Sequence, residues 1–149
     1  MGKLPYAETF RDLIVYQKAR QLAREIFMVT RSFPKEKVYS LTDQVRRSSR
    51  SIGAQVAEAW ARRRYEKHFV SKLADADGEQ LETQHWIEVA TDCGYIEPGQ
   101  AAQLLAKCAE VGRMLGIMIY KPEPFLLGQE PTVREESMEY ITESELAEP

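Results

Sequence analysis

Arginine is the residue type with the clearest chemistry in this sequence. Three arginines follow one another at positions 62–64, and a lysine follows at position 67. A guanidinium stays charged at physiological pH and binds phosphate oxygens, so a surface that groups several such cations can bind nucleic acid. A solvated basic face is the alternative interpretation. The candidate nucleic-acid-binding residues, provided that the fold brings them together, are Arg62, Arg63, Arg64, Lys67, Arg24 and Arg31.

A second set of arginines has acidic residues as its predicted partners. Arg47 and Arg50 lie in a predicted helix over 38–64, and the following helix is rich in Asp and Glu. If the two helices form an antiparallel hairpin, residues whose numbers sum to about 129 face one another. That register places Arg47 near Glu82 and Arg50 near Glu79. We therefore predict structural ion pairs between these helices.

One short motif has the spacing of a metal site. Glu82 and His85 form a Glu-x-x-His, which di-iron helical bundles use twice, together with two further glutamates. The other histidine, His68, follows Glu66 at the wrong spacing for a second copy. We predict no metal and no cofactor. The sequence also lacks a nucleophile with a base in reach, a glycine-rich phosphate loop and a Cys-x-x-Cys, so we predict no enzymatic activity.

Apolar periodicity predicts the elements that position these residues. In the first helix the spacing of Val15, Ala19, Leu22 and Ile26 keeps one apolar stripe on one face. Comparable patterns, interrupted by proline and glycine, predict helices over about 9–31, 38–64, 65–93 and 98–120. The predicted fold is all-α: an up-down-up-down four-helix bundle that forms one domain over residues 1–120.

The end of the last predicted helix is apolar on every side. A helix with this pattern cannot turn all of its large side chains toward one core, so it indicates a subunit partner. The oligomer-interface candidates are Met114, Ile117, Met118 and Tyr120. We therefore expect the protein to associate with copies of itself.

Charge divides the chain into a mildly basic body and an acidic tail. Residues 1–120 contain 18 Lys and Arg against 15 Asp and Glu, whereas residues 121–149 contain 2 against 8. With its prolines and glutamates, the tail over 121–149 is predicted to be largely disordered or to form one marginal helix. It carries charge that could shield the basic body.

Cysteine content and hydropathy suggest the cellular setting. Cys93 and Cys108 are the only cysteines, and we expect them to be core thiols rather than a disulfide. No apolar run approaches the length of a membrane span, and the first residues show no secretory signal pattern. We expect a cytoplasmic protein without a membrane partner.

Several motifs together resemble a known bacterial family, the four-helix bundle proteins described as 23S rRNA intervening-sequence proteins. The resemblance covers about residues 9–120. At Gly53, Gln55 and Ala59 the chain departs from the family, which often has proline, asparagine and glycine there. The matching segments are Phe10–Leu13, Val15–Ala19, Phe33-Pro34, Tyr39–Ser49, Ser51-Ile52, Val56–Ala59, Phe69–Leu73, Glu82–Gln84 and Asp92–Ile96.

The resemblance also implies an assembly state and binding partners. It implies an up-down bundle that assembles as a homopentameric ring. The chain is also similar to the accessory protein of diversity-generating retroelements, and that similarity implies RNA or DNA and a reverse transcriptase as partners. We expect a non-enzymatic homo-oligomeric scaffold that contacts nucleic acid. The alternative functions are a nucleic-acid-binding accessory protein and, less in keeping with the motifs, a metal-dependent bundle enzyme.

Overall fold

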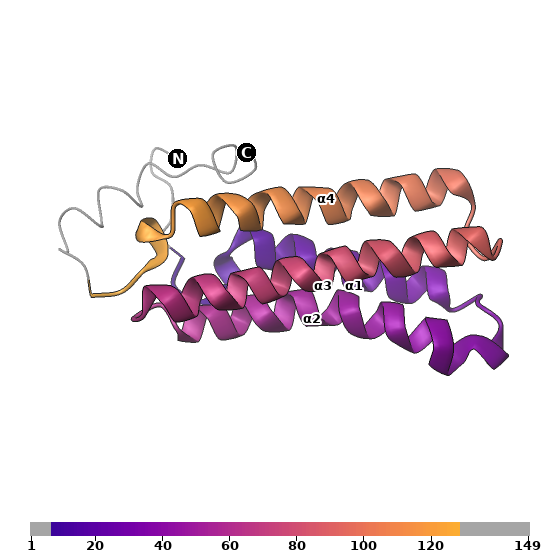
Figure 1. Cartoon of the computed structure of the whole chain (residues 1–149), viewed down its shortest axis with the longest axis horizontal. Helices are drawn as coiled ribbons and strands as arrows, with labels where there is room; N and C mark the ends of the chain where they lie inside the picture. The colour runs from indigo at the N-terminus through magenta and orange to yellow at the C-terminus, as the bar shows by residue number, and fades with distance from the viewer. Residues whose placement is uncertain (1–6, 129–149) are drawn as a thin grey trace.

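The computed structural model describes residues 7–128, and its architecture is four long helices packed side by side (Figure 1). Each helix runs antiparallel to the next one in the chain and contacts its sequence neighbours, and α1 also contacts α4. No strand occurs within residues 7–128. The predicted all-α fold with four helices is confirmed. The helices are α1 (Ile14–Thr30), α2 (Asp43–Ala61), α3 (Glu66–Asp92) and α4 (Pro98–Tyr120).

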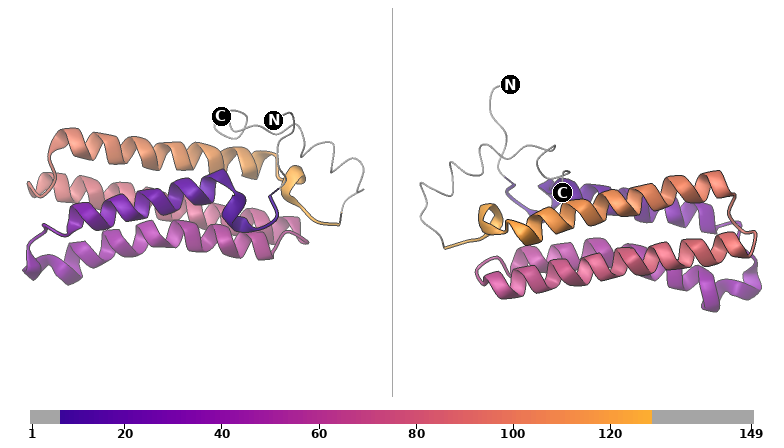
Figure 2. Two further views of the ribbon diagram at one scale, coloured as in Figure 1. Left: turned by 180° about the vertical axis from the view of Figure 1, so that it is seen from behind. Right: turned by 45° about the horizontal axis from the view of Figure 1, so that its top comes forward.

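The predicted apolar stripe of α1 forms part of the core. Val15, Ala19, Leu22 and Ile26 are each at most 1% exposed. Seen from behind, α1 lies between α2 and α4, so its stripe has two neighbours to pack against (Figure 2). The 3.6-residue period was therefore sufficient to identify the buried face of this helix.

The beginning of α1 differs from the prediction. Thr9 caps a separate 3₁₀ turn, Phe10–Asp12, in which its side chain and that of Asp12 form a capping box. Leu13 then has an extended conformation (φ −69°, ψ 129°), so α1 begins at Ile14 rather than at residue 9. Backbone N–H groups of Thr9 and Glu8 donate to the Asp12 carboxylate and lower its pKa. The capping residues therefore belong to the short 3₁₀ turn and not to α1.

The α2 helix also has different bounds from those predicted. A 3₁₀ turn, Lys35–Lys37, and a π-helical turn, Val38–Thr42, precede it. A π turn is wider than an α-helical one, and here the sequence neighbours Leu41 and Thr42 are both buried. At the other end, Arg62 leaves the helical conformation (φ −103°, ψ 12°). The α-helix therefore spans 43–61 within the predicted 38–64.

The predicted bounds of α3 and α4 are correct to within one residue. Gly94 has φ +78°, the left-handed conformation that glycine adopts most easily. The N–H groups of Gly94 and Tyr95 donate to the carbonyls of Thr91 and Ala90, which is the hydrogen-bond pattern of a Schellman motif. Pro98 then occupies the first turn of α4, where its missing N–H costs nothing.

Polar contacts between α2 and α3 confirm the antiparallel register. The Thr83 hydroxyl lies 2.9 Å from the Ser48 hydroxyl, and both residues are buried. Nearer the turn, Lys72 Nζ lies 3.3 Å from Glu58 Oε1. These pairs follow the predicted register with a shift of one to two residues. A hydrogen-bonded pair of small polar side chains, Ser48 and Thr83, thus lies inside the bundle between α2 and α3.

Helices α3 and α4 pack closely at Gly112. A Cβ atom at this position would lie 2.7 Å from Gln80 Nε2. Gln80 is only 4% exposed and is tied by hydrogen bonds to Asp77 and Gln84, so it has little freedom to move aside. The close packing therefore depends on the absence of a side chain at Gly112.

We expect Gly112→Ala to lower the free energy of unfolding by about 1–3 kcal/mol, because overpacking a filled interface forces neighbouring side chains to shift. Gly116→Ala is the matched control. Apart from the adjacent residues and the backbone of its own helix, no atom of the described residues lies within 4 Å of a Cβ added there. The control should raise stability by up to about 1 kcal/mol, because alanine favours the helix. Chemical denaturation measures both, and equal effects would contradict the packing argument.

The packed part of the chain continues beyond α4, where we expected the tail to begin. A 3₁₀ turn, Glu123–Phe125, follows α4, and Phe125 and Leu126 are buried at 6% and 2% exposure. The rings of Phe125 and Phe69 stack with centroids 6.3 Å apart. Leu127 N–H donates to the carbonyl of Arg63 at 2.9 Å. The residues immediately after Tyr120 therefore belong to the bundle. The rest of the predicted tail, residues 129–149, lies outside the described residues.

Candidate nucleic-acid interface

The six predicted cations do not form one surface. Arg62, Arg63 and Arg64 lie in the connection between α2 and α3, whereas Arg31 follows α1 at the opposite end of the bundle. The 19 residues of α2 separate these ends by roughly 28 Å. Arg24 is exposed part-way along α1. The sequence-adjacent cations at the turn thus remain one group, and Arg31 is not part of it.

Arg63 is more closely packed than its neighbours. Its guanidinium lies 3.4 Å from the centre of the Trp60 ring, and its Nε donates to the Trp60 carbonyl at 2.8 Å. Arg62, Arg64 and Lys67 are exposed. The tripeptide of arginines therefore contains one cation that packs on the bundle and two that extend into solvent.

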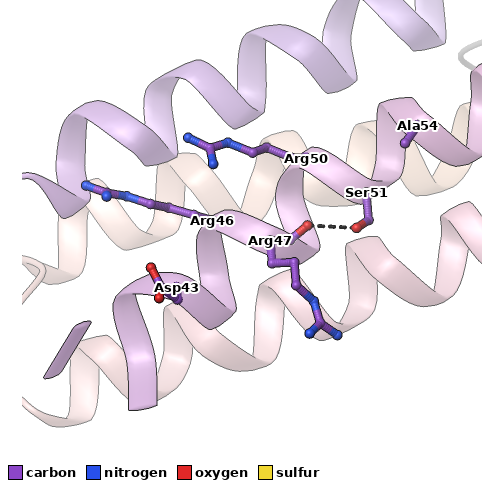
Figure 3. A pocket seen from close by; sticks show the side chains of 6 residues that line it. All are labelled: Asp43, Arg46, Arg47, Arg50, Ser51 and Ala54. Carbon is purple, nitrogen blue, oxygen red and sulfur yellow. Dashed lines mark hydrogen bonds between the residues drawn. The ribbon is translucent and has the colours of Figure 1, made fainter. Parts of the chain in front are cut away.

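A different group of arginines shares one side of α2. Arg46 and Arg50 extend in the same direction, toward α1 (Figure 3). Their guanidinium carbons lie 4.7 and 5.7 Å from the centre of the Phe27 ring. Arg46 Nε also donates to the Thr30 hydroxyl at 2.8 Å. Cation–π contacts and one hydrogen bond thus hold two positive charges close together.

Arg47 extends away from these two arginines (Figure 3). It is close enough to α3 to act on Glu79. Burial raises the pKa of the Glu79 carboxyl, repulsion from Glu82 raises this pKa further, and attraction to Arg47 opposes both effects. The predicted proximity of Arg47 to the acidic side of α3 is therefore present, with Glu79 as the carboxylate that it influences.

The predicted ion pairs themselves do not form within residues 7–128. Neither Arg47 nor Arg50 comes within ion-pair distance of Glu79 or Glu82 there. Arg50 instead lies against Phe27 of α1. Glu82 accepts a hydrogen bond from Trp86 Nε1 at 3.0 Å. The register correctly gave the level of each residue along the helix axis, but not the direction in which its side chain extends.

Other carboxylates of the bundle pair with lysines. Glu110 lies 3.4 Å from Lys18, and Glu25 pairs with Lys107, both across the α1–α4 interface. Glu58 pairs with Lys72. The arginines of α2 are thus left without a carboxylate ion pair in the part of the chain that the structure describes.

These arginines surround a shallow surface depression (Figure 3). Three arginines outnumber the single carboxylate of Asp43 in its lining, which gives a formal charge of +2. Arg47 and Arg50 are exposed and Arg46 is half-buried. Its lining consists of Asp43, Arg46, Arg47, Arg50, Ser51 and Ala54. We call Arg46, Arg47 and Arg50 the α2 arginine face.

Comparison with known proteins identifies the family. The 23S rRNA-intervening sequence protein family matches residues 11–116. The chain belongs to this family. The match includes all of α2 and its arginine face, and it confirms the resemblance seen in the sequence motifs. No curated protein matches the chain.

A solved structure of similar fold is the crystal structure of a protein of unknown function from the S23 ribosomal protein family of Bacteroides thetaiotaomicron. It is 27% identical to the present chain, with a TM-score of 0.63, and the match covers 71% of this chain and 98% of that one. The fold is thus shared along nearly the whole of that relative, whose function is not known.

The Glu-x-x-His motif has structural contacts in this member of the family. Glu82 accepts the Trp86 indole N–H, and the His85 ring lies edge-on to Trp86 with centroids 4.8 Å apart. Within residues 7–128, no three His, Cys, Asp or Glu side chains gather closely enough to hold a metal ion. The two residues therefore serve here as partners of the half-buried Trp86.

Two of the four oligomer-interface candidates are internal. Met114 and Met118 are at most 1% exposed within the single bundle, so they contribute to its own core. Ile117 is half-buried and Tyr120 is 80% exposed. Of the four candidates, Ile117 and Tyr120 are thus the ones accessible to a neighbouring subunit.

The sequence also led to expectations about the cysteines and about membrane-spanning helices. Both cysteines are free. Cys108 is buried, and desolvation raises the pKa of its thiol to about 12, whereas Cys93 is exposed and is not the core residue we expected. Among the described helices, none combines the length and apolar character that crossing a membrane requires.

Proposed function

We propose that this protein is a non-enzymatic, self-associating four-helix scaffold that binds nucleic-acid phosphates through the α2 arginine face. One observation supports nucleic-acid binding above all. Arg46, Arg47 and Arg50 line an open depression and have no carboxylate ion pair within residues 7–128. Guanidinium groups bind phosphate oxygens in the same bidentate way as they bind carboxylates, so phosphates are suitable ligands for three arginines that lack a carboxylate pair.

The contacts that Arg46 and Arg50 make with α1 favour binding. Arg46 is held by Thr30 and Phe27, and Arg50 by the same ring. Side chains that are ordered before binding lose less conformational entropy when the ligand arrives. Only Nε of Arg46 is used in a hydrogen bond to the described residues, so its terminal N–H groups remain for a phosphate.

The family suggests which ligand to test first, because it is named for an intervening sequence of 23S rRNA. An RNA duplex is therefore the first probe, and a DNA duplex of the same sequence is the second. Contacts to phosphates position a protein on a nucleic acid without reading its sequence, so we expect little sequence preference.

Self-association is the second part of the proposal. Tyr120 is 80% exposed and Ile117 is half-buried at the end of α4, where a neighbouring copy could cover them. The family resemblance adds a homopentameric ring, which would repeat the α2 arginine face around an axis and strengthen binding to a long ligand. Light scattering that gives the mass of a single chain at micromolar concentration would reject this part.

Binding measured against salt tests the nucleic-acid part of the proposal. If three phosphates are neutralised per subunit, the affinity for an RNA duplex should fall about 40-fold between roughly 50 and 200 mM salt, because counterion release dominates. Fluorescence anisotropy of a labelled duplex measures this dependence. Absence of binding at about 50 mM salt, or an affinity that does not respond to salt, would reject nucleic-acid binding.

The acidic tail calls for one comparison in the same experiment. A variant that ends at Gly128 retains Phe125 and Leu126, which are buried against the bundle. It removes seven glutamates and one arginine, a net change of +6 in charge. Tighter binding by this variant than by the full chain would show that the tail shields the basic body.

A further inference from the structure

An exposed tyrosine stands among cations at the end of the bundle where α2 connects to α3. Tyr65 is 60% exposed, and its ring lies 5.7 Å from that of His68, which is also exposed. The adjacent cations Arg62, Arg64 and Lys67 are exposed too. We call Arg62, Arg64, Tyr65, Lys67 and His68 the turn cluster.

The position of the tyrosine is fixed although its ring is in solvent. The Tyr65 carbonyl accepts from Phe69 N–H at 2.9 Å, and Phe69 is 1% exposed in the core. The Tyr65 N–H donates to the Arg62 carbonyl at 3.0 Å. An aromatic face is therefore presented to solvent from a backbone that the buried Phe69 anchors.

The cations of the turn cluster have no ion pair with a carboxylate in the described range, although the exposed Glu66 lies between them in sequence. Proteins bind single-stranded nucleic acid by stacking its bases on exposed aromatic rings, while neighbouring cations contact its phosphates. A duplex buries all base faces except those of its two terminal pairs in its own stack, and so offers Tyr65 far fewer faces to stack on than a single strand does.

From these observations we infer that the turn cluster binds unpaired nucleotides, with a base stacked on Tyr65 and phosphates on the neighbouring cations. The inference extends the proposed function from the backbone of a duplex to unpaired bases. Arg50 and Arg62 are about 18 Å apart along α2, as the helical rise predicts. A duplex bound at the α2 arginine face could therefore extend a single-stranded end to the turn cluster.

The test compares a short oligouridine with a blunt RNA duplex, using the full chain. Tyr65→Ala should weaken binding of the single strand roughly 5- to 150-fold, which is the range for losing one stacked base, and should leave duplex binding unchanged. Tyr65→Phe keeps the ring and should bind as the unchanged protein does. Tyr39→Ala is the control, because Tyr39 is 80% exposed at the other end of the bundle.

Three outcomes would overturn the inference. Tyr65→Ala could leave the single-strand affinity unchanged, Tyr65→Phe could lose as much affinity as Tyr65→Ala, or a polyglutamate peptide could bind the turn cluster more tightly than oligouridine. The last result would assign these residues to an acidic protein segment. Duplex binding that depends on Arg50 would survive each outcome, so the inference can fail while the proposed function stands. If Tyr65→Ala weakens binding of the single strand but duplex binding does not depend on Arg50, only the proposed function is rejected.

Discussion

Replacing both exposed arginines of the α2 arginine face by glutamate, Arg47→Glu with Arg50→Glu, is expected to weaken binding of an RNA duplex about 100-fold. Each charge-assisted hydrogen bond to a phosphate contributes about 1.5 kcal/mol or more, and two are lost. The slope of affinity against salt should also fall, from about three neutralised phosphates to about one. Anisotropy titrations at several salt concentrations measure both quantities.

A matched control separates the location of the charge from its amount. Arg50→Glu alone should weaken binding about 10-fold. Arg113→Glu makes the same change in net charge at an exposed position of α4 and should change affinity less than about 2-fold. Equal losses in the two variants would mean that net charge, rather than the α2 arginine face, controls binding.

The second large effect concerns stability. We expect Phe125→Ala to lower the free energy of unfolding by about 3 kcal/mol, because the substitution removes a buried aromatic ring and leaves a cavity. Phe125 is 6% exposed and its ring stacks on that of Phe69, a core residue of α3. Chemical denaturation followed by circular dichroism measures the change.

Leu127→Ala serves as the control for this prediction. Leu127 belongs to the same segment but is 39% exposed, so its truncation should cost less than about 1 kcal/mol. If Phe125→Ala were as mild as the control, the segment after α4 would not belong to the folded bundle. The sequence-based boundary at residue 120 would then hold.

Helix boundaries could be predicted where the sequence contains a strong local signal. Gly94 and Pro98 mark the end of α3 and the beginning of α4, and both bounds are correct to within one residue. The beginning of α1 could not be predicted in the same way. Thr9 and Asp12 are a valid capping box, but nothing local shows that Leu13 becomes extended before the helix begins.

Side-chain direction around a helix axis was the main limit on predicting the site. The antiparallel register, supported by the Ser48–Thr83 contact, gives the level of Arg50 along α2. It does not determine whether Arg50 extends toward α3 or toward α1, because adjacent residues on a helix differ by about 100° in direction. The structure places it on Phe27 of α1.

The interface prediction at the end of α4 shows a related limit. Met114 and Met118 were predicted to contact a neighbouring subunit, yet both are fully buried in the single chain. The segment after α4 adds Phe125 and Leu126 to the buried apolar residues. This addition depends on the residues after Tyr120 packing against the end of the bundle where α2 connects to α3, which the proline- and glutamate-rich sequence did not suggest.

An arginine footprint tests the central claim most directly. The full chain is modified with an arginine-selective reagent, with and without an RNA duplex, and the modified positions are identified by mass spectrometry. We predict that the duplex protects Arg47 and Arg50 and leaves Arg113 as reactive as before. Bound duplex without protection of Arg47 and Arg50, or with equal protection of Arg113, would contradict the assignment of nucleic-acid binding to the α2 arginine face.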